Sequence, residues 1–235
     1  MLIEHPTDGL ILFETGAGKD YPSRWSPLYN DLFPRVDYTE EQELDAQIKL
    51  TGHDIKDIKA VVMGHLHLDH AGGLEYFQGT NVPIYVHELE LKQAFYAVAS
   101  KQDYGVYTED YLTFNLNWQP FSLSGNDILE VAKGINIRHA PGHTAGLCVM
   151  QVNMPDSGTW LFTTDMYHVW ENYEGHVGGW LLRDQEAWMR SHQMIRWLVK
   201  RTNAKVVLGH CWKVCTGKCG ATGFDADTSV DGWSV

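Results

Sequence analysis

Short runs of apolar and β-branched residues alternate along this chain with segments whose apolar residues recur at helical spacing. Each run is bounded by polar or turn-forming residues, and most are apolar on both faces or nearly so, which is typical of buried β-strands. The predicted strands cover residues 9–16, 59–64, 82–87, 135–140, 147–152, 159–164 and 204–209.

Between these runs, three segments have the pattern of helices. Thr39 and Gln42 have the spacing of a capping box, which predicts a helix ending at about Leu50. A second helix is predicted over 88–100 and a third over 184–201, the third with an apolar stripe along one side. Strands mixed with helices over this length predict an α/β fold in which helices cover sheets.

Length and composition favour one domain. The 235 residues are 44% hydrophobic, which is enough to bury a single sizeable core. We therefore predict one domain over residues 1–212. Residues 213–235 are poor in apolar side chains and have no clear period, so we predict an atypical, loosely held C-terminal tail.

The charge balance and the cysteines narrow the class of protein. Eighteen Lys and Arg against 30 Asp and Glu give a net charge of -12, which argues against a nucleic-acid partner. We find neither a secretory signal nor an apolar run long enough to cross a membrane. Four clustered cysteines do not make a disulfide framework, so we expect a cytoplasmic protein. They are Cys148, Cys211, Cys215 and Cys219.

The stretch "GHLHLDHAGG" at 64–73 crowds three histidines and an aspartate together: His65, His67, Asp69 and His70. On an extended strand end, the side chains of His65 and His67 point the same way, and the other two can reach the same point from the following turn. Imidazole and carboxylate bind Zn²⁺ and similar ions. A purely structural role would leave four polar groups to be buried at a cost of several kcal/mol.

Three more candidate ligands follow predicted strands. His143, Asp165 and His210 each come after an apolar run and before a loop, so we expect them at one edge of the sheets. Each histidine alone is more often structural. Seven ligands exceed the need of one zinc ion and suit two divalent metals that share a carboxylate. We interpret the other histidines that we considered as structural or solvated: His5, His53, His87, His139, His176 and His192.

An aromatic-rich segment begins within the second predicted helix and extends towards the third. Its side chains either pack in the core or, if they face the metals, form an apolar wall for an acyl chain or an aromatic ring. The sequence leaves both readings open. The aromatics are Phe95, Tyr96, Tyr104, Tyr107, Tyr111, Phe114 and Trp118.

The pattern His-x-His-x-Asp-His with a distant His, Asp and His resembles the metallo-β-lactamase superfamily over residues 9–212. The resemblance implies an αβ/βα sandwich of two mixed sheets packed face to face, with helices outside. It implies two metal ions, with Zn²⁺ as the expected metal, and Asp165 as the ligand that bridges them. One ion would be held by His65, His67 and His143, and the other by Asp69, His70 and His210.

Within the superfamily, the chain is most similar to N-acyl-homoserine lactone lactonases and their fungal-type lactamase relatives. The segments that carry this likeness are "ILFETG", "HLHLDHAGG", "APGHTAG", "DMYHVWENY" and "VVLGH". It implies that a metal-bridging hydroxide opens a small-molecule lactone or lactam ring. The alternatives are a thioester hydrolase of the same superfamily and a truncated metal-binding protein without turnover. Whether two copies associate as a homodimer stays open.

Three residues are candidates for catalysis beside the metals. Asp69 is placed to orient the water or to move a proton. The lactonases have a tyrosine three residues after the bridging aspartate, whereas this chain has His168 there, with Tyr167 one residue earlier. Either His168 or Tyr167 is expected to donate a hydrogen bond to the substrate.

The two ends also differ from the superfamily pattern. One or two N-terminal strands are expected to be shortened or missing, and the residues after Trp212 do not resemble the usual ending. A truncated or alternatively spliced product would explain both differences, and we expect such a product to be less stable or inactive.

Overall fold

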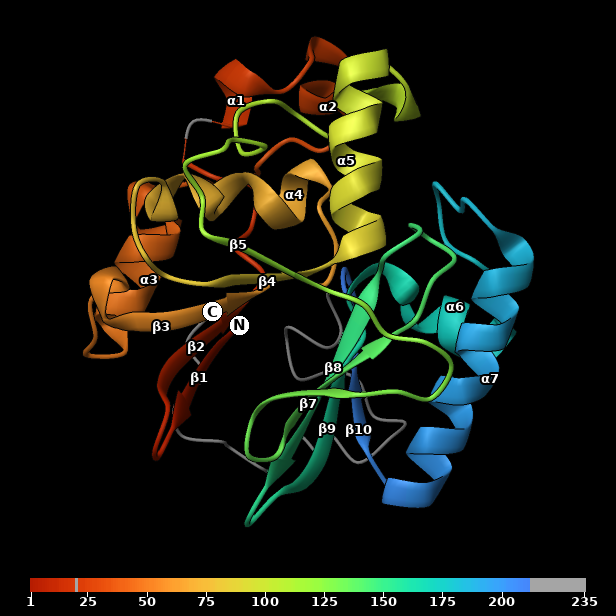
Figure 1. Cartoon of the computed structure of the whole chain (residues 1–235). Helices are drawn as coiled ribbons and strands as arrows, with labels where there is room; N and C mark the ends of the chain where they lie inside the picture. Colours follow the sequence, from red (N-terminus) through yellow and green to blue (C-terminus); the bar gives the residue numbers. More distant parts are fainter. Residues whose placement is uncertain (20, 212–235) are drawn as a thin grey trace. The chain divides into compact units, whose positions relative to one another are not determined.

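The computed structural model describes residues 1–19 and 21–211. The chain divides into two units after Phe121. Each unit contains its own five-stranded mixed sheet together with helices (Figure 1). The predicted tail, residues 213–235, lies outside the described residues, as do Cys215 and Cys219. None of the helices in the described ranges is both long enough and apolar enough to cross a membrane.

The sheet of the first unit has the strand order β1-β2-β3-β4-β5. β1 and β2 are antiparallel, and the remaining neighbours are parallel. The carboxyl ends of β2, β3 and β4 therefore lie at one edge of this sheet. The sequence predicted these three strands but neither β1 nor β5. The bounds are β1 Leu2–His5, β2 Gly9–Phe13, β3 Ile58–Val62, β4 Ile84–His87 and β5 Trp118–Phe121.

The helices of the first unit are short except for α5. The helix predicted from Thr39 is a 3-10 turn followed by α3, and the backbone N–H of Thr39 donates to Gln42 Oε1 at 3.1 Å. The second predicted helix, α5, begins after His87, whose Nδ1 accepts from the Leu89 N–H at 3.2 Å. That contact confirms a structural role for His87. The α-helices are α1 Tyr21–Arg24, α2 Pro27–Leu32, α3 Leu44–Leu50, α4 Leu68–Ala71 and α5 Glu88–Ser100, and the 3-10 turns are Glu40–Gln42, Ile55–Asp57, Gly72–Phe77 and Asp103–Gly105.

The sheet of the second unit has the order β10-β9-β8-β7-β6. β9 and β10 are parallel and the other pairs are antiparallel. Because β8 runs opposite to both β7 and β9, the strands β7, β9 and β10 all end at the same edge. The sequence predicted four of these strands and missed β6. The bounds are β6 Leu129–Ala132, β7 Ile135–His139, β8 Cys148–Met154, β9 Gly158–Phe162 and β10 Lys205–Val207.

A long helix covers the core of the second unit. α7 Gln185–Thr202 is capped by Asp184, whose carboxylate accepts from the Ala187 N–H at 2.9 Å. As its apolar stripe predicts, α7 buries Trp188 and Ile195 against strand residues such as Val149. The shorter elements of this unit are the 3-10 turn Thr164–Met166 and α6 Trp170–Gly175. This packing fixes the loops that follow β7 and β9.

Candidate metal centre

In the first unit, the four side chains of the His-x-His-x-Asp-His motif come from one short segment: His65 and His67 from the loop between β3 and α4, and Asp69 and His70 from α4 itself. His65, His67 and His70 are buried. The ring centroid of His65 lies 4.7 Å from that of His67 and 4.1 Å from that of His70. The Asp69 carboxylate lies 3.5 Å from His70 Nε2. The sequence-predicted ligands of this motif therefore lie together.

Side chains from elsewhere in the unit hold the middle of this loop. The backbone N–H of Leu66 donates to Glu90 Oε1 at 2.9 Å, and the Tyr111 hydroxyl donates to the Leu66 carbonyl at 2.7 Å. The Tyr107 hydroxyl donates to the same Glu90 oxygen at 3.2 Å. Burial raises the pKa of both tyrosines, so both remain neutral donors. Of the aromatics whose role the sequence left open, Tyr107 and Tyr111 thus shape the loop.

One carboxylate at this edge, that of Glu14, was not predicted from the sequence. It follows β2 directly, and its two oxygens lie 3.5 Å from His65 Nδ1 and 3.1 Å from His70 Nδ1. Burial alone would raise the pKa of Glu14, but the charges and hydrogen bonds of His70 and His65 outweigh it and hold the pKa well below its usual range. Its place after an apolar strand, like that of Asp165, is the signal that could have revealed it.

In the second unit, three imidazoles approach one buried carboxylate. The Asp165 oxygens lie 3.5 Å from His143 Nε2, 3.3 Å from His168 Nε2 and 3.0 Å from His210 Nε2. The His143 side chain is buried, whereas that of His210 is 42% exposed. The predicted ligands of this unit therefore also lie together, with His168 among them.

The backbone of the second unit keeps these side chains in place. The N–H groups of Gly209 and His210 donate to the carbonyls of Tyr167 and His168 at 3.0 and 2.9 Å, so the segment after β10 pairs with the one after β9. Before His143, Gly142 adopts a φ of +144°, and a Cβ on it would lie 2.5 Å from the Cα of Trp188. Only glycine fits there.

The structure separates the two candidate substrate donors. Tyr167 is fully buried, and its hydroxyl is hydrogen-bonded to His192 Nδ1 at 2.8 Å. Burial raises its pKa. His168 instead lies beside Asp165 and is 20% exposed. Its Nδ1 is close to Gly179, where a Cβ would lie 2.0 Å away.

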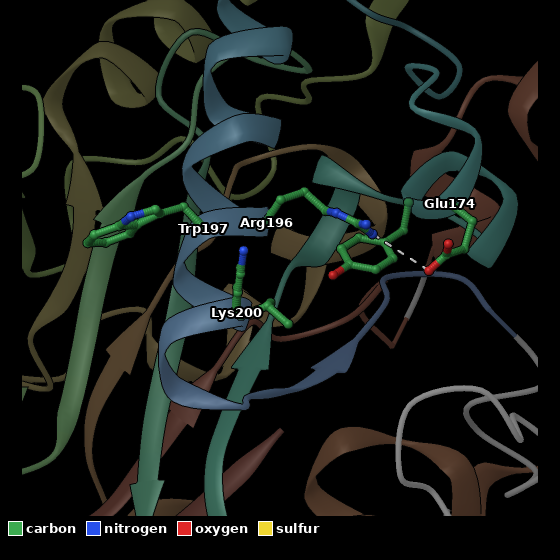
Figure 2. Close-up of a pocket in the computed structure, with 6 residues that line it drawn as sticks. Glu174, Arg196, Trp197 and Lys200 are labelled. Carbon is green, nitrogen blue, oxygen red and sulfur yellow. Dashed lines mark ion pairs between the residues drawn. The ribbon is translucent and has the colours of Figure 1, made fainter.

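A surface cavity of about 500 Å³ lies on α6 and α7 of the same unit (Figure 2). Arg196 lies over the Tyr173 ring at 4.7 Å and forms an ion pair with Glu174 at 3.6 Å. None of the predicted site residues lines it, so we place no part of the reaction there. The lining residues are Tyr173, Glu174, Arg196, Trp197, Val199 and Lys200.

The donor set in both units fits a divalent cation. Buried imidazole nitrogens grouped with carboxylate oxygens are the ligands of Zn²⁺ and related ions, and gathering them without a cation would leave much of their desolvation uncompensated. Neither cluster includes a thiolate. Divalent ions of intermediate hardness other than zinc therefore suit both clusters as well.

Comparison with known proteins agrees with this chemistry. Residues 1–210 match the family model of the metallo-beta-lactamase superfamily, so the chain belongs to that superfamily. It is 28% identical to the N-acyl homoserine lactonase AttM of Azorhizobium caulinodans, over 89% of this chain and 80% of that one. It is also 28% identical to the N-acyl homoserine lactonase AiiA of Bacillus thuringiensis subsp. kurstaki, over 86% and 77% of the two chains.

Solved structures extend the likeness to the fold. A B. thuringiensis AiiA variant with N-decanoyl-L-homoserine at its active site matches 92% of this chain with a TM-score of 0.75 and 26% identity, over 81% of its own length. An N-acyl homoserine lactone hydrolase with N-hexanoyl-L-homoserine at its catalytic metal centre matches with a TM-score of 0.73 and 25% identity, over 92% of this chain and 81% of its own. The predicted αβ/βα sandwich class and the lactonase-like resemblance are confirmed. The chain is a metal-dependent hydrolase of this superfamily.

Proposed function

We propose that this chain opens a lactone ring, and by the same chemistry a lactam ring, with two divalent metal ions of which Zn²⁺ is the expected one. The observation that carries the proposal is the buried Asp165 carboxylate with three imidazoles around it, in a chain whose relatives are named as lactonases. When bound, two such ions supply a hydroxide nucleophile at neutral pH and polarise the carbonyl that it attacks.

The ligand assignment follows the superfamily resemblance and is supported by the grouping inside each unit. We assign Asp165 to both ions because its two oxygens face different histidines. The remaining ligands divide into two sets of three. One ion is assigned to His65, His67 and His143, and the other to Asp69, His70 and His210.

Two side chains of this chain are assigned to proton transfer and to hydrogen bonding with the substrate. The Asp69 side chain is 34% exposed, so its carboxylate can exchange a proton with solvent while staying near His70. We assign the hydrogen bond to the substrate to His168, since the Tyr167 hydroxyl already binds His192 inside the unit. Tyr167 would reach substrate only after breaking that bond.

The test is a panel of substrates offered to the purified, metal-loaded full chain. N-acyl homoserine lactones, simple lactones, lactams and glutathione thioesters are compared by the acid or thiol that they release. We expect lactone hydrolysis that stops when a chelator removes the metal. Preference for thioesters would support the thioester hydrolase instead, and full metal content without turnover on any substrate would support a metal-binding protein.

A further inference from the structure

Glu14 directly follows β2, and its side chain contacts the segment that carries His65 and His70. Its backbone N–H donates to the Val62 carbonyl at the end of β3, at 3.0 Å. The next residue, Thr15, donates to the His70 carbonyl through both its N–H and its hydroxyl, each at 2.9 Å. Two segments thus fix the position of Glu14 relative to the histidines before its side chain makes any contact.

The backbone of Glu14 is held in a conformation that glutamate rarely adopts. Its φ is +57°, in the left-handed region, which is unfavourable for a residue with a side chain. Such strain persists where the surrounding structure requires it, and it is concentrated at functional sites. In this conformation the carboxylate contacts both imidazoles.

The two carboxylate oxygens approach two different histidines, each at the same ring atom. Oε1 lies 3.5 Å from Nδ1 of His65, and Oε2 lies 3.1 Å from Nδ1 of His70. A carboxylate accepts hydrogen bonds and donates none, so Glu14 favours the tautomer with hydrogen on Nδ1 in both rings. In His70, Glu14 is the nearer carboxylate, since Asp69 lies 3.5 Å from Nε2. In that tautomer, the lone pair available to a metal is on Nε2.

We propose that Glu14 is a positioning residue that fixes the ring orientation and tautomer of His65 and His70 together, and so couples the binding of two metal ions. The coupling rests on the proposed function, which assigns these histidines to different ions. Loss of a carboxylate that orients a ligand typically weakens metal binding 10- to 100-fold. Because Glu14 contacts one ligand of each ion, its removal should weaken the binding of both metal ions.

Two variants separate this role from a merely structural one. Glu14→Gln keeps the size of the side chain but replaces one acceptor oxygen with an amide that donates, so one of the two rings must give up its contact or change tautomer. Glu14→Asp keeps the charge but is one methylene shorter, so it can hold at most one ring well. The matched control is Glu4→Gln on β1, whose side chain is 74% exposed.

The experiment reads the histidines and the metals without substrate. Long-range ¹H–¹⁵N spectra of the metal-free full chain report the tautomers of His65 and His70, and competition with a chromophoric chelator gives the Zn²⁺ affinities. We expect Nδ1–H in both rings of the wild-type chain and in Glu4→Gln. In Glu14→Gln, we expect an altered tautomer in one ring and both Zn²⁺ affinities reduced about 10- to 100-fold.

Glu14→Asp should retain one Nδ1–H contact and give an intermediate loss. Unchanged tautomers in Glu14→Gln, or a loss confined to one ion, would overturn the proposal, provided that a thermal melt shows the variant folded. If Glu14→Gln does not fold, Glu14→Asp decides by the same two readings. A wild-type chain that bound two ions but hydrolysed no lactone would refute the proposed function and leave this inference standing.

Discussion

His192 offers a quantitative test of the second unit, because it is a histidine kept neutral inside the fold. It is 3% exposed on α7, with its ring stacked on the Trp188 indole at 5.0 Å. Its Nδ1 binds the Tyr167 hydroxyl, and its Nε2 lies 2.6 Å from Nδ1 of His176. Burial, then the neighbouring His176, then Arg196, lower the pKa of His192 to about 4 from 6.5.

The sign of the effect on stability follows from the lowered pKa. As pH falls below 6.5, the unfolded chain takes up a proton at this histidine while the folded chain does not, so the contribution to stability present at neutral pH is lost between 6.5 and 4. Between pH 7.5 and pH 5, this loss amounts to about 2 kcal/mol.

The variant that tests this effect is His192→Gln, which removes the titrating imidazole and retains an amide that can form a hydrogen bond with Tyr167. Urea unfolding of the metal-free chain at pH 7.5 and pH 5 gives the loss of stability for each protein. We expect the wild-type chain to lose about 2 kcal/mol more than the variant over this step. Equal losses in wild type and His192→Gln would refute the assignment of a neutral, buried His192.

Two further predictions concern the loops of the second unit. His168→Phe should reduce lactam hydrolysis by about 10²-fold and activated lactone hydrolysis less, because an imidazole can protonate a poor leaving group. The metal content should stay unchanged, since His168 is not an assigned ligand. Equal losses on both substrates would mean that His168 only shapes the site. Gly142→Ala should destabilise the chain in urea by about 2–4 kcal/mol, because its Cβ would overlap Trp188. The control Gly158→Ala is also at a positive φ, +80°, but has nothing within 4 Å of its Cβ, so it should cost about 1 kcal/mol. Equal costs would show that the clash is relieved elsewhere.

The strands that the sequence revealed and those that it concealed differ in their place in the sheets. The missed strands β1, β5 and β6 are all edge strands. An edge strand has a neighbour on one side only and tolerates polar residues, such as Glu4 in β1, Glu130 in β6 and the proline at position 120 in β5. Interior strands read as continuous apolar runs and were predicted. The fourth edge strand, β10, was predicted as well because it lies within such a run, so an edge strand is missed only where its sequence is interrupted by polar residues or proline.

The candidate site shows the same division between local and distant information. The candidate metal ligands could be proposed from the sequence because each lies in one motif or in the loop after an apolar strand. Glu14 contacts His65 and His70, and Tyr111 contacts Leu66, across long stretches of chain. A position after an apolar strand could have marked Glu14 as a candidate, but no local pattern gives its partners, since they depend on which strands become neighbours. The residues that shape the site were therefore found only in the structure.

The proposed hydrolysis depends on two metal ions that share Asp165 as a ligand. The most direct measurement is the number of metal ions bound per chain together with the rate of lactone hydrolysis, in the wild-type chain and in Asp165→Ala. We expect about two ions and measurable turnover in the wild-type chain, and loss of both in the variant, because each ion loses a ligand. Asp165→Ala that retained its metal and hydrolysed lactones at the wild-type rate would contradict the account.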